Sequence, residues 1–351
     1  MSRFIQLHAL TSYPPANLNR DDLGRPKTAK VGGSERLRIS SQSLKRAWRT
    51  SDLFQEALCG NIGTRTKRIG IEVRNRLVEK GIDSKKAKEW AKEIARQFGK
   101  LKKENNTSPD DDLQIEQLAH FSPEEWKLVM NLADVLASEK RAPKNEELSL
   151  LTKAQTAVDI AFFGRMLPSK PSFNIDAAVQ VAHAITTHSV SIEDDYFTAV
   201  DDLNKRETDA GAGHVGDAGF ASGLFYLYTC INCDLLIKNL GENDTLAGKA
   251  IGAFVETMAK VSPSGKQNSF ASRAYASYIM AETGSQQPRS LSVAFLKPIA
   301  GTDILNSSIQ AIEEQTLKMD KIYGLCADKR KILNVEKEEG SIQEIIDFCK
   351  G

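Results

Sequence analysis

The chain has 351 residues, of which 41% are hydrophobic and 26% are charged, a composition that is typical of globular proteins and excludes a wholly disordered chain. Because 47 Lys and Arg nearly balance 46 Asp and Glu, general coating of nucleic acid or membrane is excluded, and any such contact has to lie in a local groove. Five scattered cysteines favour reduced thiols, and with neither a signal-peptide core nor an apolar run of about 20 residues, we expect a cytoplasmic protein without a membrane partner.

Two short strands are predicted in the first 40 residues. Residues 4–10 alternate apolar and other side chains, and we expect the prolines at 14 and 15 to end this strand. After a loop with paired glycines, residues 36–40 (RLRIS) alternate in the same way. This alternation predicts a second strand with Arg36 and Arg38 on one basic face.

A basic helix is predicted to follow and to end near Thr50. Leu44, Ala47 and Trp48 recur at helical spacing and form a packing face, while polar and basic side chains gather on the opposite side. Either serine at positions 40 and 41 can cap this helix, and we expect the other amides of its first turn to point outward, where an anion would bind.

The region around this helix holds a local excess of positive charge. Residues 20–49 contain nine Lys or Arg and three acids, which predicts a phosphate site, although a solvated surface helix shows a similar pattern. The polar and basic side chains proposed for this site are Arg20, Lys27, Arg38, Ser40, Gln42, Lys45, Arg46 and Arg49.

Residues 53–150 are highly charged and helical in period, so we interpret them as a helical insertion between strands of one sheet. The clearest helix start is at Ser122, with Pro123 as the first helical residue and Glu125 as the reciprocal acid of a capping box. Phe121 and Trp126 are placed to form a hydrophobic staple.

The remaining elements mix strands and helices, which indicates an α+β fold. Strands are predicted at 158–163, 220–233, 275–282 and 290–296, whereas 179–188 fits strand and helix periods almost equally. Helices are predicted at 245–260, 305–323 and 342–349.

A long acidic excursion separates two of these strands. Residues 193–209 hold seven acids and two bases, with Tyr196, Phe197, Val200 and Leu203 interleaved. Long loops in compact domains are usually functional or disordered. An acidic and aromatic protrusion on a molecule with a basic groove can dock on an identical neighbour, and such a heterologous contact generates an open row of subunits.

Other motifs carry weaker signals, and we expect neither a cofactor nor a metal. The segment 211–216 (GAGHVG) lacks the preceding strand and following helix of a dinucleotide site. Cys230 and Cys233 have zinc-like spacing but no second pair, and the five histidines show no ligand spacing. His183 and His188 are expected to pack or to form hydrogen bonds.

Two alternative functions remain open from the residues alone. Asp21 and Asp22 lie beside the basic loop and are suited to hold a divalent metal that cleaves bound RNA, but adjacent acids also shape loops through salt bridges. The other alternative is a stand-alone binder of single-stranded nucleic acid, whose stoichiometry would rise smoothly with strand length.

Several runs closely resemble CasC, the backbone-subunit family of type I-E CRISPR Cascade, and the similarity covers essentially the whole chain in order. They are LNRDD (18–22), GG (32–33), RISSQSLKRA (38–47), VDIAFFGRM (158–166), VAHAITTH (181–188) and YFTAVDDL (196–203). The resemblance implies an RRM-like antiparallel palm (1–52, 151–190 and 220–351), helical fingers (53–150) and a β-hairpin thumb (191–219).

The resemblance also implies partners. Copies of such a subunit stack head to tail along a CRISPR RNA guide, which then pairs with target DNA in segments, alongside other Cascade subunits. The protein itself would read only backbone and shape, without acting as an enzyme.

Site residues follow from the resemblance too. Without the resemblance, the residue types alone would place Met166 in a hydrophobic core and Phe197 in a buried packing position. Unlike relatives that are more basic after the paired glycines, this chain has Ser34 and Glu35 there. Along the RNA the family would place Arg20, Lys27, Ser40, Gln42, Lys45, Arg49 and Met166, and in the thumb Phe197, Thr198, Val200 and His214.

Overall fold

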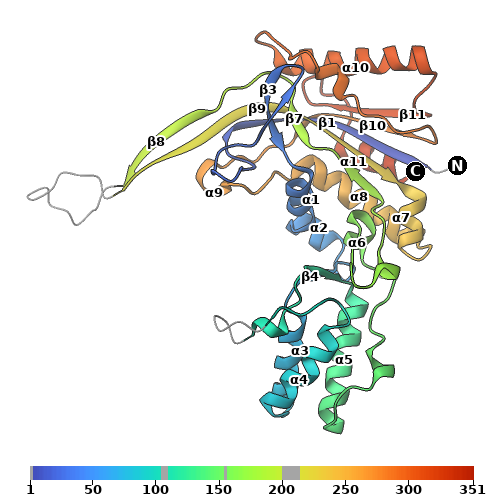
Figure 1. Cartoon of the computed structure of the whole chain (residues 1–351). Coiled ribbons are helices and arrows are strands. Elements are labelled where there is room, and N and C mark those ends of the chain that lie inside the picture. The colour runs from blue at the N-terminus through green and yellow to red at the C-terminus, as the bar shows by residue number, and fades with distance from the viewer. Residues whose placement is uncertain (1–2, 104–109, 154–155, 200–213) are drawn as a thin grey trace, which may run out of the picture. The chain divides into compact units, whose positions relative to one another are not determined.

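The computed structural model describes residues 3–103, 110–153, 156–199 and 214–351, with the backbone alone at 214 and 215. The fold is α+β with an antiparallel sheet, as predicted (Figure 1). The chain forms two compact units. Unit 1 consists of Met1–Phe54, Val181–Ile231 and Ile251–Gly351, and unit 2 of Gln55–Gln180 and Asn232–Ala250.

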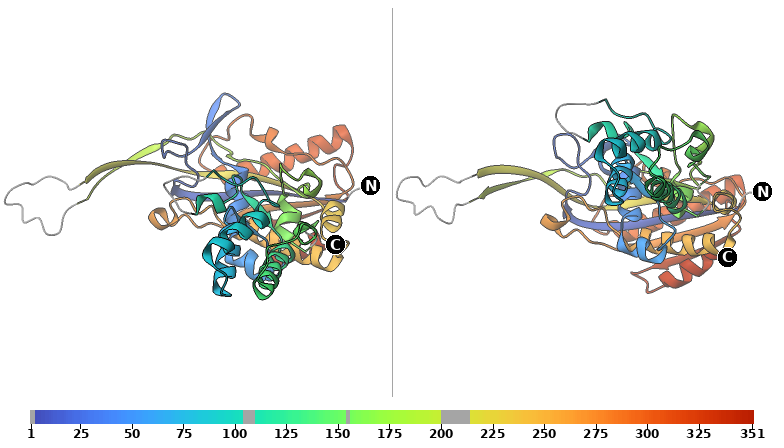
Figure 2. Two further views of the ribbon diagram at one scale, coloured as in Figure 1. Left: turned by 60° about the horizontal axis from the view of Figure 1, so that its bottom comes forward. Right: turned by 90° about the horizontal axis from the view of Figure 1, so that it is seen from below.

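The main sheet runs through unit 1 in the order β11-β10-β1-β9-β7-β3-β2. Its strands are β1 (Phe4–Ala16), β2 (Thr28–Val31), β3 (Ser34–Ile39), β7 (Ala184–Thr186), β9 (His214–Asn232), β10 (Ala276–Gly284) and β11 (Lys329–Asn334). A further strand, β8 (Glu193–Ala199), pairs with the first part of β9 and forms a hairpin that extends beyond the sheet in both views of Figure 2.

Helices cover both faces of this sheet. On one face, Tyr226 of β9 packs in a core with residues of α10 (Ile304–Tyr323). On the other face, Thr229 of β9 contacts Met258 in α8 (Asp244–Lys260). Successive strand residues point to opposite faces, so these contacts place α10 and the end of α8 on opposite sides. The other helical segments of this unit are α1 (Ser41–Arg49), α9 (Gln267–Phe270), the 3₁₀ turn Ser292–Phe295 and α11 (Ile342–Lys350).

A buried cluster of charged and polar side chains joins the four strands β1, β9, β10 and β11 of the sheet. Glu282 of β10 is fully buried and is bound by the guanidinium groups of Arg289 and Arg330, the latter at 2.6 Å. His8 Nε2 lies 3.3 Å from the same carboxylate, and its Nδ1 lies 2.9 Å from the hydroxyl of Tyr226. Burial lowers the pKa of His8, so the ring is neutral and links Tyr226 to Glu282.

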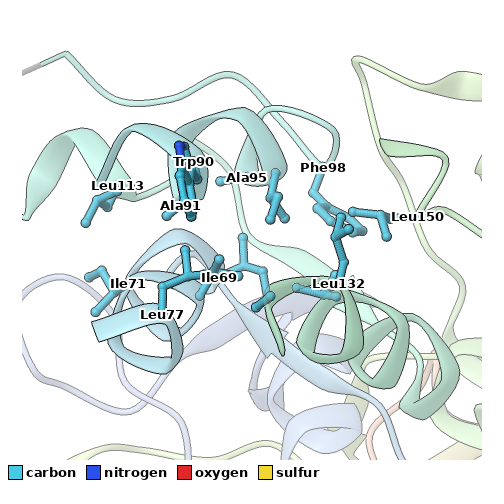
Figure 3. Packing of buried hydrophobic residues seen from close by; sticks show 14 of the residues in the cluster. Ile69, Ile71, Leu77, Trp90, Ala91, Ala95, Phe98, Leu113, Leu132 and Leu150 are labelled. Atoms are coloured by element: carbon cyan, nitrogen blue, oxygen red, sulfur yellow. The ribbon is translucent and has the colours of Figure 1, made fainter. Parts of the chain in front are cut away.

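Unit 2 is mainly helical and has its own core. Ile69, Leu77, Trp90, Phe98 and Leu132 meet in the cluster of Figure 3. This unit contains the helices α3 (Ile69–Glu79), α4 (Ser84–Ala95), α5 (Pro123–Glu139), α6 (Val158–Phe163) and α7 (Cys233–Asn239) and the paired strands β4 (Thr64–Thr66) and β5 (Ala119–Phe121). Across the described ranges of both units, no helix is long and apolar enough to cross a bilayer.

The predicted start of α5 is confirmed. Ser122 Oγ accepts a hydrogen bond from the Glu125 amide at 3.1 Å, and the Glu125 carboxylate accepts one from the Ser122 amide at 3.0 Å. Phe121 and Trp126 pack edge to face with ring centroids 6.1 Å apart. Glu125 also accepts two hydrogen bonds from the buried guanidinium of Arg165, at 2.7 and 2.8 Å.

Three predictions of secondary structure were wrong. Residues 158–163 form helix α6 and not a strand. The helix is short and buried on nearly all sides, so its sequence shows no helical alternation of apolar and polar residues. Residues 290–296 contain a 3₁₀ turn. The prolines at 14 and 15 do not end β1, which continues to Ala16. The pairing of β1 with β10 stops at Thr11. A proline lacks the N–H group of other residues, but because these prolines lie beyond Thr11, this costs no hydrogen bond to β10.

The other predicted elements were found, with small shifts in their ends. The ambiguous segment 179–188 forms the short strands β6 (Val179–Val181) and β7. The helix predicted to end near Thr50 is α1, and Thr50 is its C-cap. Strands β2 and β11 were not predicted, because their side chains do not alternate clearly in burial.

Replacing Arg165 with Met is expected to destabilise unit 2 by about 3–5 kcal/mol, because the buried Glu125 carboxylate loses its charged partner. Urea unfolding followed by circular dichroism measures this change. Arg141→Met is the matched control, since Arg141 pairs with Glu147 at a partly exposed site, where solvent screens the pair, and should destabilise the unit much less. Equal effects of the two variants would contradict this assignment.

The buried His8 predicts a pH dependence. Its folded pKa lies below 6.5, so the unfolded chain binds an extra proton as the pH falls below that value. The free energy of unfolding should therefore decrease from pH 7 to pH 5, by up to about 1.4 kcal/mol per pH unit from this group. His8→Gln should flatten this slope in urea titrations, and an unchanged slope would refute the assignment.

Candidate nucleic-acid interface

The packing of α1 sets which of its side chains face outward. Leu44, Ala47 and Trp48 are buried, and Trp48 meets Phe254 edge to face with ring centroids 5.4 Å apart. The opposite side is polar, as predicted: Gln42 and Arg46 are exposed, while Lys45 and Arg49 are partly exposed. Partial burial lowers the pKa of Lys45.

The first turn of α1 is satisfied mostly within the protein. Ser40 is the N-cap, and its hydroxyl accepts a hydrogen bond from the Ser43 amide at 3.3 Å. The Ser41 amide donates to His183 Nδ1 at 3.2 Å, and the guanidinium of Arg38 lies 3.3 Å from the same nitrogen. The Ser43 amide is thus capped as predicted, but the prediction that the other amides of this turn are free to bind an anion is wrong for Ser41, where contact with an anion falls to the side chains.

His183 was expected only to pack or to form hydrogen bonds, and its hydrogen bonds connect Arg38 to the start of α1. Partial burial lowers the pKa of His183 first, and the charges of Arg38 and Lys27 lower it further. The ring is therefore neutral near pH 7, which leaves Nδ1 able to accept the two hydrogen bonds.

The loop before β2 is fixed by its own hydrogen bonds. Asp21 Oδ1 accepts hydrogen bonds from the amides of Leu23 and Arg25, each at 2.9 Å. Asn17 Nδ2 donates to the carbonyl oxygens of Gly24 and Gly219, each at 2.9 Å. Asp21 thus shapes the loop through backbone contacts.

A groove of about 470 Å³ lies between this loop and the start of α1. Part of its lining comes from residues that the sequence did not indicate, because they follow α8 far along the chain. The lining residues are Leu18, Asn19, Arg20, Asp21, Asp22, Gly24, Ser43, Ser264 and Gly265. Only the small and polar composition of Ser264 and Gly265 hinted at a loop there.

Arg20 lines this groove beside Asp21 and Asp22, while Lys27, Lys45 and Arg46 belong to the chain segments next to it. Among the described residues, Arg20, Lys27, Lys45 and Arg46 form no ion pair with Asp or Glu, whereas the neighbouring Arg25 binds Asp194 at 2.9 Å. Positive side chains without acidic partners beside a polar groove are suited to phosphate groups.

Arg36 does not belong to this surface, contrary to the predicted basic face of its strand. Its side chain is buried and donates hydrogen bonds to the carbonyl oxygens of Thr186 at 2.8 Å and Phe295 at 2.9 Å. The 3₁₀ turn that contains Phe295 covers this end of β3, so Arg36 supports the sheet while Arg38, two residues further, stays partly exposed.

Met166 belongs to unit 2, whereas the other predicted RNA contacts belong to unit 1. Its side chain is 74% exposed, so the core position that its residue type suggested is wrong. With Phe98, Leu118 and Leu167 it lines a pocket of about 290 Å³.

The hairpin of β8 and β9 carries the predicted thumb residues. Phe197 is 43% exposed and pairs with Gly216, where an added Cβ would lie 2.6 Å from the Phe197 ring. Thr198 is exposed on β8, and His214 begins β9. Val200 and Leu203 lie outside the described residues.

The two segments whose spacing resembles a metal site or a dinucleotide site form regular secondary structure. Cys230 lies in β9 and Cys233 at the start of α7, and both are buried. Residues 214–216 of the glycine-rich segment are the first residues of β9. In the ranges that the structure describes, no three His, Cys, Asp or Glu residues gather in a way that could hold a metal ion.

Comparisons with known proteins match nearly the whole chain. Two solved structures cover 99% of it and 99% of their own chains: a chain of a "CRISPR RNA-guided surveillance complex, pre-nicking" at 30% identity with a TM-score of 0.86, and a chain of a "CRISPR RNA-guided surveillance complex" at 26% identity with a TM-score of 0.77. No curated protein matches. The model of the CT1975-like family of Cas proteins matches residues 5–347, and the protein therefore belongs to this family.

Proposed function

We propose that this protein is the guide-binding backbone subunit of a Cascade complex of type I-E. It binds CRISPR RNA in the groove of unit 1, and copies of it polymerise head to tail along the guide. The assembled row presents the guide in segments for pairing with target DNA and works with other Cascade subunits in antiviral defence in the cytoplasm.

The observation that carries this proposal is the set of unpaired cations around the groove. Lys and Arg contacts to phosphate position a strand without reading its bases. This suits a subunit that has to bind any guide sequence, and it agrees with the surveillance complexes in which the similar chains were solved.

Polymerisation is supported by charge on two parts of the same unit. The exposed hairpin carries Glu193 and Asp195 on β8, beside Asp194, which pairs with Arg25 of the same copy, and the groove and the segments next to it carry unpaired cations. An acidic protrusion on one copy and a basic groove on another form a contact between different surfaces, which repeats without closing.

We propose that the protein does not cleave RNA. The Asp21 carboxylate already accepts two amide hydrogen bonds within its loop, and Asp22 is exposed at the rim of the groove. This arrangement supports a loop-shaping role for Asp21. Incubation of the assembled protein with guide RNA and magnesium tests the proposal, because regularly spaced cuts that vanish in Asp21→Ala would overturn it.

Lys45→Ala and Lys27→Ala should each weaken RNA binding by about fivefold at 0.1 M salt and lower the salt slope of log K by about 0.7, the value for one phosphate on a single strand. The loss should be the same for unrelated RNA sequences, and fluorescence anisotropy at several salt concentrations measures it. Lys318→Ala on α10 is the control, because Lys318 pairs with Glu314 and should not affect binding. A sequence-dependent loss would contradict the assignment.

Native mass spectrometry should show integer numbers of copies on guides of increasing length, with each added copy requiring a fixed number of nucleotides. The reason is that each subunit contacts its neighbour as well as the RNA. A smooth rise in bound protein, without preferred copy numbers, would indicate a stand-alone binder of single strands instead.

A further inference from the structure

The loop at 261–275, here called the α9 loop, has a strained backbone. Lys266 and Ala271 flank the single helical turn of α9 and have φ angles of 45° and 49°. This left-handed region costs free energy for residues other than glycine. Strain of this kind persists only where surrounding contacts hold it, and it is concentrated at functional sites.

Internal hydrogen bonds hold the α9 loop in this conformation. The buried Ser272 donates to the side chain of Gln267 at 2.8 Å. Ser262 Oγ accepts from the Ala274 amide at 2.9 Å, which closes the base of the loop. The loop is thus built as a rigid element.

The α9 loop is also fixed against the groove and the hairpin. Gly265 packs so closely on the loop before β2 that an added Cβ would lie 2.2 Å from the Leu18 carbonyl oxygen. Phe270 lies beside Phe220 of β9, with ring centroids 6.3 Å apart. Phe220 pairs with Glu193 at the base of the hairpin, so the loop connects the groove to that base.

These contacts place one further cation next to residues that line the groove. Ser264 and Gly265 line it directly, and Lys266 is the next residue. Lys266 is partly exposed and, among the described residues, forms no ion pair. A glycine would adopt this left-handed backbone conformation at a lower free-energy cost. The conformation at position 266 therefore does not require a lysine.

We propose that the α9 loop is a second wall of the RNA-binding groove, in which Lys266 binds a phosphate of the same strand that the cations around α1 contact. This proposal rests on the proposed function and assigns to it a residue far along the chain. Placing the wall at the base of the hairpin lets one strand contact α1, the α9 loop and the hairpin in turn.

Lys266→Gly separates this role from a structural one, because the two roles predict changes of opposite kind. Glycine relieves the left-handed backbone, so the midpoint of thermal unfolding should rise by about 1–2 °C. At the same time the affinity for the shortest RNA that binds one copy should fall about fivefold at 0.1 M salt, and the salt slope should fall by about 0.7.

Ala271→Gly is the matched control, since it relieves the same strain in the same loop without removing a charge. It should raise the unfolding midpoint and keep the wild-type salt slope. Lys45→Ala, measured in parallel, tests the proposed function separately.

Two results would overturn the role of Lys266. If Lys266→Gly keeps the wild-type affinity and slope while Lys45→Ala loses them, the α9 loop does not contact RNA, although the groove does. If Lys266→Gly binds the short RNA normally but forms fewer copies on long guides, Lys266 faces a neighbouring copy.

Discussion

Positive charge that the molecule does not neutralise itself is the constraint on which the site depends. Arg20 lines the groove, and Lys27, Lys45 and Arg46 belong to the segments next to it. All four lack acidic partners among the described residues, and such an excess of positive charge favours an anionic ligand. Partial burial lowers the pKa of His183, and the charges of Arg38 and Lys27 lower it further. A phosphate strand neutralises this excess of positive charge, so the ligand should also stabilise the fold.

Other cations of the same chain have a different role. Arg36, Arg165 and Arg289 are buried or nearly so, and their guanidinium groups bind backbone carbonyls or buried carboxylates. Arg36 and Arg38 lie two residues apart on one strand, yet the 3₁₀ turn at Phe295 covers only the first. Burial by distant segments, and not residue type, decides whether an arginine supports the sheet or faces a ligand.

Local patterns predicted much of the fold. The cap at Ser40, the capping box at Ser122 and the apolar face of α1 depend on neighbouring residues, and each was found where the sequence placed it. Predictions that depend on tertiary contacts were less successful. Periodicity did not reveal the burial of Arg36, the helical state of α6 or the contribution of the α9 loop to the groove, because segments far apart in the chain create them.

The account is tested most directly by ultraviolet cross-linking of the full chain, assembled on guide RNA, followed by identification of the linked peptides. We predict cross-links in peptides that cover residues 17–49 and in those that cover 261–275. Cross-links confined to α10 and α11, with none in those two segments, would contradict the central claim that the unpaired cations of unit 1 bind the guide.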